Sequence, residues 1–453
     1  MSSIYYIEDI DSLRFALSIF DGFDLEKLQP HFPGYPVFCF LGSILYLITG
    51  SLANTFSIIG GLSIFIIIYF SLLIVKHHKF SLEYFSLIII ILLNPMFILM
   101  SNRYMPDLMG LSLFVASFYF LTHNSSKENN IGGFMYGLLI GTRLSYFPLL
   151  IIPYLIIFNR KKLKEIIILF IYTLLGCLIW LLPMIWLTGF QDLIYLAQNQ
   201  TFGHFNDYGG TFFTEYNWSN RFFYFFQTIW SDGLGGYWPG RSSLTILLTL
   251  SSLPCLFFSL LWIKRNINNE KNILILFLSI LMYSIFALYF QNVIYKSRHV
   301  MPIVYFLVLL IPFSLHAIKR TLFYKITFVI YLVSLLILSV NITIQHKEPT
   351  AISKLGTYFR SLGEPITIAT NPLINYYLTS TGIQTTFINI ENINEIKNSN
   401  SFKKNTFMIG DFHELIANNV QIQRDTSFYH NPYVNRMWST INIYTLNHNI
   451  EQK

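Results

Sequence analysis

Five short segments of this 453-residue sequence place charged side chains or histidine beside long apolar runs. The segments are DSLRFALSIFDGFD (residues 11–24), HFPGYP (31–36), SNRYMPD (101–107), GTRLSYFP (141–148) and KSRHVMP (296–302). A carboxylate beside a membrane-embedded cavity can act as a general base on a hydroxyl or an amine. Arginine and lysine can hold a phosphate, arginine through its planar fork and lysine as a point charge. The segments therefore indicate proton transfer next to a bound anion.

Asp11 and Asp107 are the acidic candidates. Asp11 is either a catalytic base or the cap of a helix over Leu13 to Phe20. Asp107 follows Pro106 at the start of an apolar run, where both residue types are also common because proline suits a helix start and the helix dipole favours negative charge. The residues alone leave these alternatives open. Further site candidates in the same segments are Arg14, His31, Tyr35 and Arg103.

The basic candidates are Arg143, Lys296 and Arg298, with His299 beside them. Arg143 falls between two very short apolar stretches, so it either faces a cavity or partner inside the membrane or extends to the interface. Lys296 and Arg298 lie on the predicted outer side, where membrane orientation disfavours basic residues. Either these two side chains bind a lipid phosphate, or they form salt bridges with Asp11 or Asp107.

A long polar and aromatic loop over residues 188–240 carries one more site candidate, His204. Its aromatic residues, as far as Tyr237 and Trp238, suit sugar rings, but they also suit the membrane interface, where Trp and Tyr gather. His204 belongs to no metal-ligand spacing, so the sequence predicts no metal site, although dependence on a divalent metal is left open. No glycine-rich phosphate loop is present in the sequence, and we expect no cofactor.

The elements that must position these residues are membrane helices. The chain is 53% hydrophobic, 17% aromatic and only 12% charged, which is far too apolar for an ordinary soluble domain. Crossing about 30 Å of hydrocarbon takes roughly 20 apolar residues in a helix. We expect ten spans, at residues 54–76, 81–100, 107–122, 132–143, 145–158, 164–187, 241–263, 272–291, 300–316 and 322–340.

The distribution of Lys and Arg predicts the orientation of these spans. The net charge of +7 arises from short basic clusters between apolar runs, which favours membrane orientation over nucleic-acid binding. If 132–143 and 145–158 are two spans, four clusters share the cytoplasmic side: Lys76 with Lys79, residues 160–164, Lys264 with Arg265, and Lys319 with Arg320. The head, the loops at 102–107, 188–240 and 296–299, and the tail then face outward. Residues 37–49 are too short to span easily and are predicted to lie on the outer interface.

Three zones follow from this organisation: residues 1–53 as an outer first loop with interfacial helices, 54–341 as the helical membrane body, and 342–453 as a small extracytoplasmic α/β domain. The tail alternates helix-like stretches with short β-rich runs at 366–370, 385–390, 406–409 and 441–446. The expected fold class is therefore an α-helical polytopic membrane protein with about ten spans and a C-terminal α/β domain.

Taken together, the five segments resemble those of the GT-C glycosyltransferase superfamily, which includes protein O-mannosyltransferases and the lipid A aminoarabinose transferase. The resemblance covers most of the membrane body. It implies that Asp11 matches the acidic catalytic residue of the first outer loop, that Asp107 matches an acidic position of the second, and that Arg298 matches a basic residue that meets the donor phosphate. Members of the superfamily have a spanning helix before the first loop, whereas this sequence begins almost at that motif.

The resemblance implies transfer of a sugar from a polyprenyl-phosphate carrier to a lipid, glycan or protein acceptor on the outer side of a bacterial cytoplasmic (inner) membrane. Asp11 is then the base, and Arg298, Lys296 and Arg143 bind the donor phosphate. The main alternative is a lipid-linked saccharide transporter or polymerase, which also needs cations for phosphate. A third interpretation is a noncatalytic assembly protein whose tail binds a partner. None of these involves nucleic acid.

Overall fold

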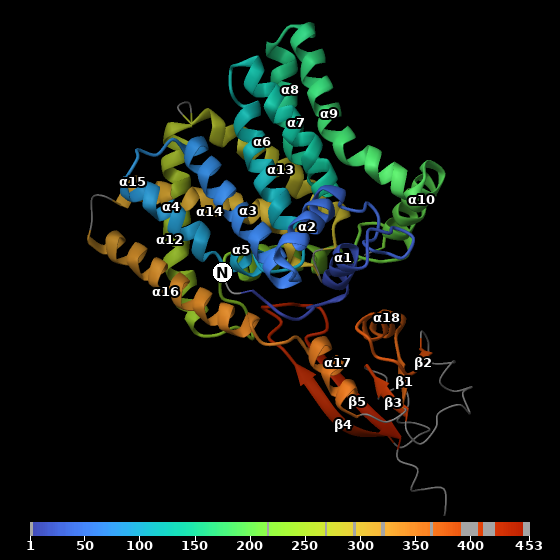
Figure 1. The fold of residues 1–453 in the computed structure, drawn as a ribbon. Coiled ribbons are helices and arrows are strands. Elements are labelled where there is room, and N and C mark those ends of the chain that lie inside the picture. Colours follow the sequence, from blue (N-terminus) through green and yellow to red (C-terminus); the bar gives the residue numbers. More distant parts are fainter. Residues whose placement is uncertain are drawn as a thin grey trace, which may run out of the picture. The chain divides into compact units, whose positions relative to one another are not determined.

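The computed structural model describes residues 3–214, 217–267, 270–292, 296–318, 322–362, 366–390, 406–410 and 422–446 (Figure 1). The chain divides into two compact units. The first unit comprises Met1–Ile4 and Arg14–Ile344, and the second comprises Tyr5–Leu13 and Gln345–Lys453. Most of the N-terminal head thus belongs to the first unit, but residues 5–13 belong with the C-terminal tail.

The first unit is helical. Its helices are α1 (Ile10–Phe20, which starts in the second unit), α2 (Pro36–Thr49), α3 (Leu52–Val75), α4 (Leu82–Leu93), α5 (Pro95–Met100), α6 (Asp107–Leu121), α7 (Ser126–Thr142), η1 (Leu144–Leu150), α8 (Ile151–Arg160), α9 (Leu163–Thr188), α10 (Phe190–Asn206), α11 (Trp218–Gln227), η2 (Thr228–Gly233), α12 (Leu244–Asn266), α13 (Lys271–Phe290), η3 (Ser297–Val300), α14 (Met301–Leu310), η4 (Ile311–Phe313), α15 (Ser314–Ile318) and α16 (Leu322–His346, which ends in the second unit).

Six helical segments among the described residues are long and apolar enough to cross a membrane, so the protein is an integral membrane protein. They are Leu52–Val75, Leu163–Thr188, Leu244–Asn266, Lys271–Phe290, Ser297–His316 and the segment that begins at Leu322. Four shorter apolar helices accompany them, at Pro36–Thr49, Leu82–Leu93, Asp107–Leu121 and Leu144–Arg160. Each predicted span contains helix, but the total of ten spans stays a prediction. The predicted basic pair Lys319 and Arg320 lies outside the described residues.

Local sequence signals explain the interruptions of these helices. The predicted span 81–100 is broken at Asn94, whose side chain accepts a hydrogen bond from the Phe97 N–H at 3.1 Å and so caps α5. Pro95 follows at the first helical position, where its missing N–H costs nothing. Arg143 separates α7 from η1, so the residues around it form two helical segments, as predicted, and not one long helix.

Two expectations for the outer segments need correction. The stretch 188–240 is not only a loop, because it contains α10, α11 and η2. Asp11 is not the cap of its helix. The helix begins at Ile10, Asp11 lies in its first turn, and the Asp9 side chain accepts the hydrogen bond from the Ser12 N–H at 2.8 Å. The structural alternative for Asp11 is therefore wrong, because Asp9 is the capping residue.

The second unit contains a five-stranded mixed sheet in the order β2-β1-β3-β5-β4. Its elements are α17 (Ala351–Leu362), β1 (Thr367–Thr370), α18 (Pro372–Ser380), β2 (Thr386–Asn389), β3 (Thr406–Ile409), β4 (Ile422–Tyr429) and β5 (Thr440–Leu446). Strand β1 pairs in parallel with β2 and β3, whereas β5 is antiparallel to β3 and β4. Four strands coincide with predicted runs. The longest strand, β4, was not predicted, because its charged residues Arg424 and Asp425 interrupt the alternation of apolar and polar residues expected of a half-buried strand.

Candidate functional site

The centre of the first unit holds one carboxylate between two guanidinium groups. Nη2 of Arg143 lies 3.0 Å from Oδ1 of Asp107, and Nε of Arg298 lies 3.4 Å from Oδ2 of the same carboxylate. The Asp107 side chain is fully buried, and those of Arg143 and Arg298 are only 6% and 8% exposed. Three segments that are far apart in the sequence, 101–107, 141–148 and 296–302, therefore meet at this cluster, which we call the Asp107 cluster.

The local backbone positions each member of the Asp107 cluster at the end of a helix. Pro106 precedes α6, and Asp107 is the first residue of that helix. Arg143 has a non-helical backbone (φ −151°, ψ 86°) between α7 and η1, while its N–H still donates to the Leu139 carbonyl at 2.7 Å. Arg298 lies in the short helix η3, immediately before α14. Because each of the three residues lies at the end of a helical segment, their side chains can approach one another without any bend in the helices.

A glycine lets α6 approach Arg143 closely. A Cβ atom at Gly110 would lie 2.8 Å from the Cβ of Arg143 and 3.3 Å from ring atoms of Tyr146. Because real Cβ atoms essentially never come within 3.0 Å of such a neighbour, any larger residue would displace Arg143 or α6. Gly110 is one turn after Asp107, so the same helix supplies both the carboxylate and the space for its partner.

Three tyrosines surround the basic side of the Asp107 cluster. Nη1 of Arg143 donates to the Tyr35 hydroxyl at 3.3 Å, and its guanidinium carbon lies 5.6 Å from the centre of the Tyr35 ring and 5.9 Å from that of Tyr146. Tyr146 packs edge-on against Tyr283, whose hydroxyl donates to the His299 carbonyl at 2.7 Å. These contacts hold the Arg143 guanidinium and the backbone next to Arg298 in fixed positions.

Two guanidinium groups share one carboxylate in the Asp107 cluster. Arg298 forms a salt bridge with Asp107, as one of the two interpretations predicts. Phosphate binding, the other interpretation, stays a prediction. Arginine donors held in a buried site are well suited to phosphate. The chemistry that this arrangement supports is recognition and charge stabilisation of a phosphate.

Other predicted site residues lie around the cluster or apart from it. Nε2 of His31 lies 3.3 Å from the Tyr35 hydroxyl, so His31 reaches Arg143 through that tyrosine. Lys296 is partly buried just before η3, while His299 is buried within η3. Arg103 is buried in the turn before α6, and Arg14 is partly buried in α1. Asp11 is 2% exposed and belongs to the second unit.

His204 has a different environment from these residues. Its Nε2 atom lies 2.8 Å from the carbonyl of Phe290, the last residue of α13. The fully buried Arg221 donates nearby to the carbonyls of Leu288, Gly210 and, at 3.0 Å, Gln291. Both side chains thus satisfy carbonyl groups that the end of α13 leaves without helical partners. These contacts attach residues 203–214 and 217–221 to the end of α13.

Sequence reasoning missed a second buried ion pair. Nη2 of Arg241 lies 2.7 Å from Oδ1 of Asp232, and their side chains are 11% and 6% exposed. Asp232 lies in η2, a π-helical turn that packs against η3 and α14 and so supports the segment of Arg298. π-Helical turns are frequent at functional sites, but nothing in the sequence marks this one.

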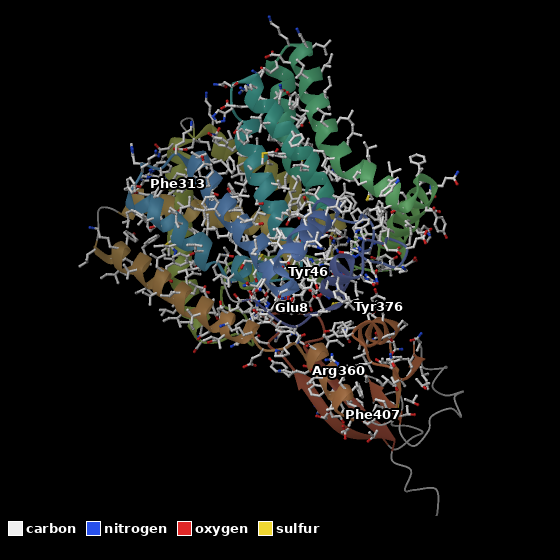
Figure 2. The ribbon with its side chains drawn as sticks, in the orientation of Figure 1. Glu8, Tyr46, Phe313, Arg360, Tyr376 and Phe407 are labelled. Atoms are coloured by element: carbon white, nitrogen blue, oxygen red, sulfur yellow. The ribbon has the colours of Figure 1, made fainter. Side chains whose placement is uncertain are left out.

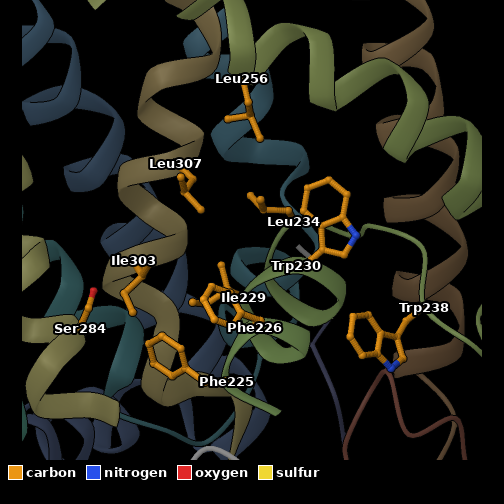
Figure 3. Close-up of a pocket in the computed structure, with 10 residues that line it drawn as sticks. All are labelled: Phe225, Phe226, Ile229, Trp230, Leu234, Trp238, Leu256, Ser284, Ile303 and Leu307. Carbon is orange, nitrogen blue, oxygen red and sulfur yellow. The ribbon is translucent and has the colours of Figure 1, made fainter. Parts of the chain in front are cut away.

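An apolar cavity of about 550 Å³ lies beside the same elements (Figure 3). Aromatic and aliphatic side chains line it almost completely, and Ser284 is the polar member of the set. The lining residues are Phe225, Phe226, Ile229, Trp230, Leu234, Trp238, Leu256, Ser284, Ile303 and Leu307. Ile303 and Leu307 belong to α14, which begins three residues after Arg298. The lining residues come from α11, η2, the loop after η2, α12, α13 and α14, and α14 directly follows η3, which carries Arg298.

No family model matches this sequence, and no curated protein sequence matches it. The crystal structure of ArnT from Cupriavidus metallidurans in the apo state aligns with a TM-score of 0.54 and 10% sequence identity, covering 98% of this chain and 94% of that chain. The structure of the same protein bound to undecaprenyl phosphate aligns with a TM-score of 0.49 and 10% identity over 96% and 92% of the two chains. The chain therefore has the GT-C fold of ArnT, a lipid A aminoarabinose transferase, and the resemblance noted in the sequence is confirmed for the fold.

Proposed function

We propose that this protein is a membrane glycosyltransferase that transfers a sugar from a polyprenyl-phosphate carrier to an acceptor on the extracytoplasmic side of a bacterial inner membrane. The observation that carries the proposal is the Asp107 cluster, in which two buried arginines share one carboxylate within a GT-C fold. A lipid-linked donor presents its phosphate at the membrane interface, and a buried, positively charged site bordered by apolar helices suits that chemistry.

The phosphate is the part of the donor that the Asp107 cluster recognises. Arg298 and Arg143 hold the phosphate oxygens, and Lys296, the residue before η3, provides an additional cation. Asp107 keeps the two guanidinium groups separated and oriented. Because the arginines are fixed before the donor arrives, little reorganisation is needed when negative charge develops on the leaving phosphate. The apolar cavity bordered by α14 suits the hydrocarbon chain of the donor.

Asp11 is the proposed general base. The acceptor oxygen or nitrogen forms a bond to the anomeric carbon of the sugar, while the bond between that carbon and the phosphate oxygen breaks. The acceptor proton goes to the Asp11 carboxylate, and polyprenyl phosphate leaves with the electron pair. A single displacement of this kind inverts the configuration at the anomeric carbon.

A transporter or polymerase of lipid-linked saccharides is the second candidate, because such a protein also uses buried cations to bind a lipid phosphate. The two functions differ in their products. A transporter moves the intact donor across the membrane, and a polymerase joins oligosaccharides, whereas a transferase releases one polyprenyl phosphate for each monosaccharide it transfers. A noncatalytic assembly protein predicts no specific binding of a lipid phosphate at all.

The test is transfer of radiolabelled sugar from a panel of polyprenyl-phosphate sugars in proteoliposomes that contain wild-type or Asp11→Asn protein. We expect transfer by the wild type and loss of at least about 100-fold in the variant, which is the usual range for a general base. Correct folding of the variant is checked by its thermal unfolding midpoint. Transfer by a well-folded Asp11→Asn protein at the wild-type rate would remove Asp11 from the mechanism, and the absence of donor consumption by the wild type would favour the transporter.

A further inference from the structure

The C-terminal unit contains, as part of its own fold, the short segment of chain that leads into α1. Residues 6–8 of this segment, which we call the head strap, are bound along their backbone. The Tyr377 hydroxyl donates to the Ile7 carbonyl at 2.6 Å, and the Thr350 hydroxyl donates to the Glu8 carbonyl at 3.0 Å. In return, the Tyr6 hydroxyl donates to the His346 carbonyl at 2.6 Å. Burial raises the pKa of the Tyr377 hydroxyl above its usual range.

A buried pair of titratable side chains anchors the head strap. Nε2 of His346 lies 2.8 Å from Oε1 of Glu8, and the two side chains are 2% and 0% exposed. Figure 2 labels Glu8 together with Arg360, Tyr376 and Phe407 of the same unit. Burying a carboxylate is expensive unless it is paired and hydrogen-bonded, so Glu8 strongly favours the arrangement that brings it to His346.

The next residue, Asp9, connects the head strap to the start of α1. Its Oδ1 atom accepts from the Ser12 N–H at 2.8 Å and caps the helix, while its Oδ2 atom accepts from Nδ2 of Asn435 at 3.0 Å. Asn435 is itself fixed, because its carbonyl lies 2.7 Å from Nε2 of His430, whose Nδ1 accepts from the Ala351 N–H at 3.0 Å. The cap of α1 is therefore held by the C-terminal unit.

We propose that the C-terminal α/β unit positions Asp11 through the Glu8–His346 pair and the Asp9–Asn435 hydrogen bond. Asp11 lies two residues after Asp9 in the first turn of α1, so its location depends on where that turn begins. Glu8, Asp9, His346 and Asn435 are positioning residues in this scheme, and the inference rests on the proposed role of Asp11 as the base. The C-terminal unit then takes part in catalysis by fixing an acidic group of the N-terminal head.

The experiment combines two measurements on the full-length protein in proteoliposomes. Hydrogen exchange at the amides of Ser12 and Leu13, which bond to Asp9, reports whether the cap is held. Transfer kinetics report whether Asp11 is in place. The variants are Glu8→Ala, His346→Ala and their double variant, with Glu8→Gln as a conservative change that keeps the acceptor oxygen. Ser427→Ala is the matched control, because it removes a 3.0 Å hydrogen bond to Asn442 between β4 and β5 of the same unit.

We expect exchange at Ser12 and Leu13 to accelerate by about tenfold or more in Glu8→Ala and His346→Ala, since each loses the same contact. Exchange in the double variant should be no faster than in either single variant, because the two residues act as one pair. Transfer should fall through kcat by about tenfold while the donor KM changes by less than about twofold, because misplacing a reacting group affects the chemical step. Glu8→Gln should keep much of the slow exchange and of the wild-type kcat. Ser427→Ala should change neither the exchange rate nor kcat.

Unchanged exchange in both alanine variants overturns the inference, whatever happens to transfer. Accelerated exchange with an unchanged kcat also overturns it, because the head strap would then be structural only. A failure of the proposed function is seen separately. If Asp11→Asn retains full transfer, or the wild type consumes no donor, the role of Asp11 is wrong even when the exchange data show that Glu8 and His346 hold the cap.

Discussion

Nη2 of Arg143 lies 3.0 Å from Oδ1 of Asp107, and neither side chain has appreciable contact with solvent. The residues are separated by a complete helical hairpin, α6 and α7, so this contact joins its two ends. Arg298 lies on the second oxygen of the same carboxylate, so two guanidinium groups share it. Both the stability of the hairpin and the proposed recognition of phosphate depend on this one carboxylate.

Asp107→Asn should destabilise the protein strongly. The substitution removes the negative charge that both guanidinium groups contact, and breaking a buried ion pair in this way typically costs about 3–5 kcal/mol. Thermal unfolding in detergent should show a clear fall of the midpoint. Lys27→Ala is the control, because it disrupts the exposed pair with Asp24 and should leave the midpoint unchanged. Equal midpoints for Asp107→Asn and the wild type would contradict a stabilising role of the cluster.

Gly110→Ala should impair donor binding although it adds only one methyl group. The new Cβ would lie 2.8 Å from the Cβ of Arg143, so the arginine must move out of its position on Asp107. We expect binding of polyprenyl phosphate to weaken by about tenfold, as measured by ligand titration in nanodiscs. The control is Gly356→Ala in α17, where the nearest atom is the flexible end of Arg360 at 3.3 Å. That variant should bind normally, and normal binding by Gly110→Ala would show that its methyl group is accommodated without moving Arg143.

Arg298→Gln should weaken the binding of polyprenyl phosphate by more than tenfold, and Arg298→Lys should give an intermediate result, because lysine retains the charge but lacks the planar fork. A loss of tenfold corresponds to about 1.4 kcal/mol. Arg265→Gln removes the same charge from the end of α12 and serves as the matched control. If the variants at 298 and 265 bind equally well, Arg298 does not contact the phosphate.

Arg221→Leu should loosen the segment 203–221 far more than His204→Ala does. The arginine satisfies the carbonyls of Gly210, Leu288 and Gln291, and each buried carbonyl that loses its donor costs about 1–3 kcal/mol. The His204 ring nitrogen Nε2, by comparison, lies 2.8 Å from the Phe290 carbonyl. Hydrogen exchange over residues 203–214 should rise strongly in Arg221→Leu and slightly in His204→Ala. Transfer by His204→Ala should stay within about threefold of the wild type, and a much larger loss would make His204 a site residue after all.

The sequence predicted the helical body well because apolar runs of membrane length leave few alternatives. The predicted span 54–76 corresponds to α3 at Leu52–Val75, and the break at Arg143 followed from the distribution of basic residues. The helices α10 and α11 were missed because their polar and aromatic composition is also that of an interfacial loop. Strand β4 was missed because its charged residues interrupt the alternation expected of a strand.

The site could be predicted only as a set of candidates. Sequence spacing identified Asp107, Arg143 and Arg298 as residues in need of partners, but it could not decide between phosphate and salt bridge, since long-range contacts leave no local signal. Glu8 and His346 are 338 positions apart and belong to no motif, so their pairing was not foreseen. The Asp232–Arg241 pair was overlooked for a different reason, because its π-helical turn has no sequence signature.

The proposed transferase activity is tested most directly by the stoichiometry of the wild-type reaction in proteoliposomes. The proteoliposomes contain a polyprenyl-phosphate monosaccharide that is labelled in both the sugar and the lipid, together with a mixed lipid acceptor fraction. A glycosyltransferase releases one polyprenyl phosphate for each labelled sugar that reaches the acceptor, and Arg298→Gln should lower both products together. Movement of the doubly labelled donor across the bilayer with neither product formed would contradict the proposed activity and identify a transporter.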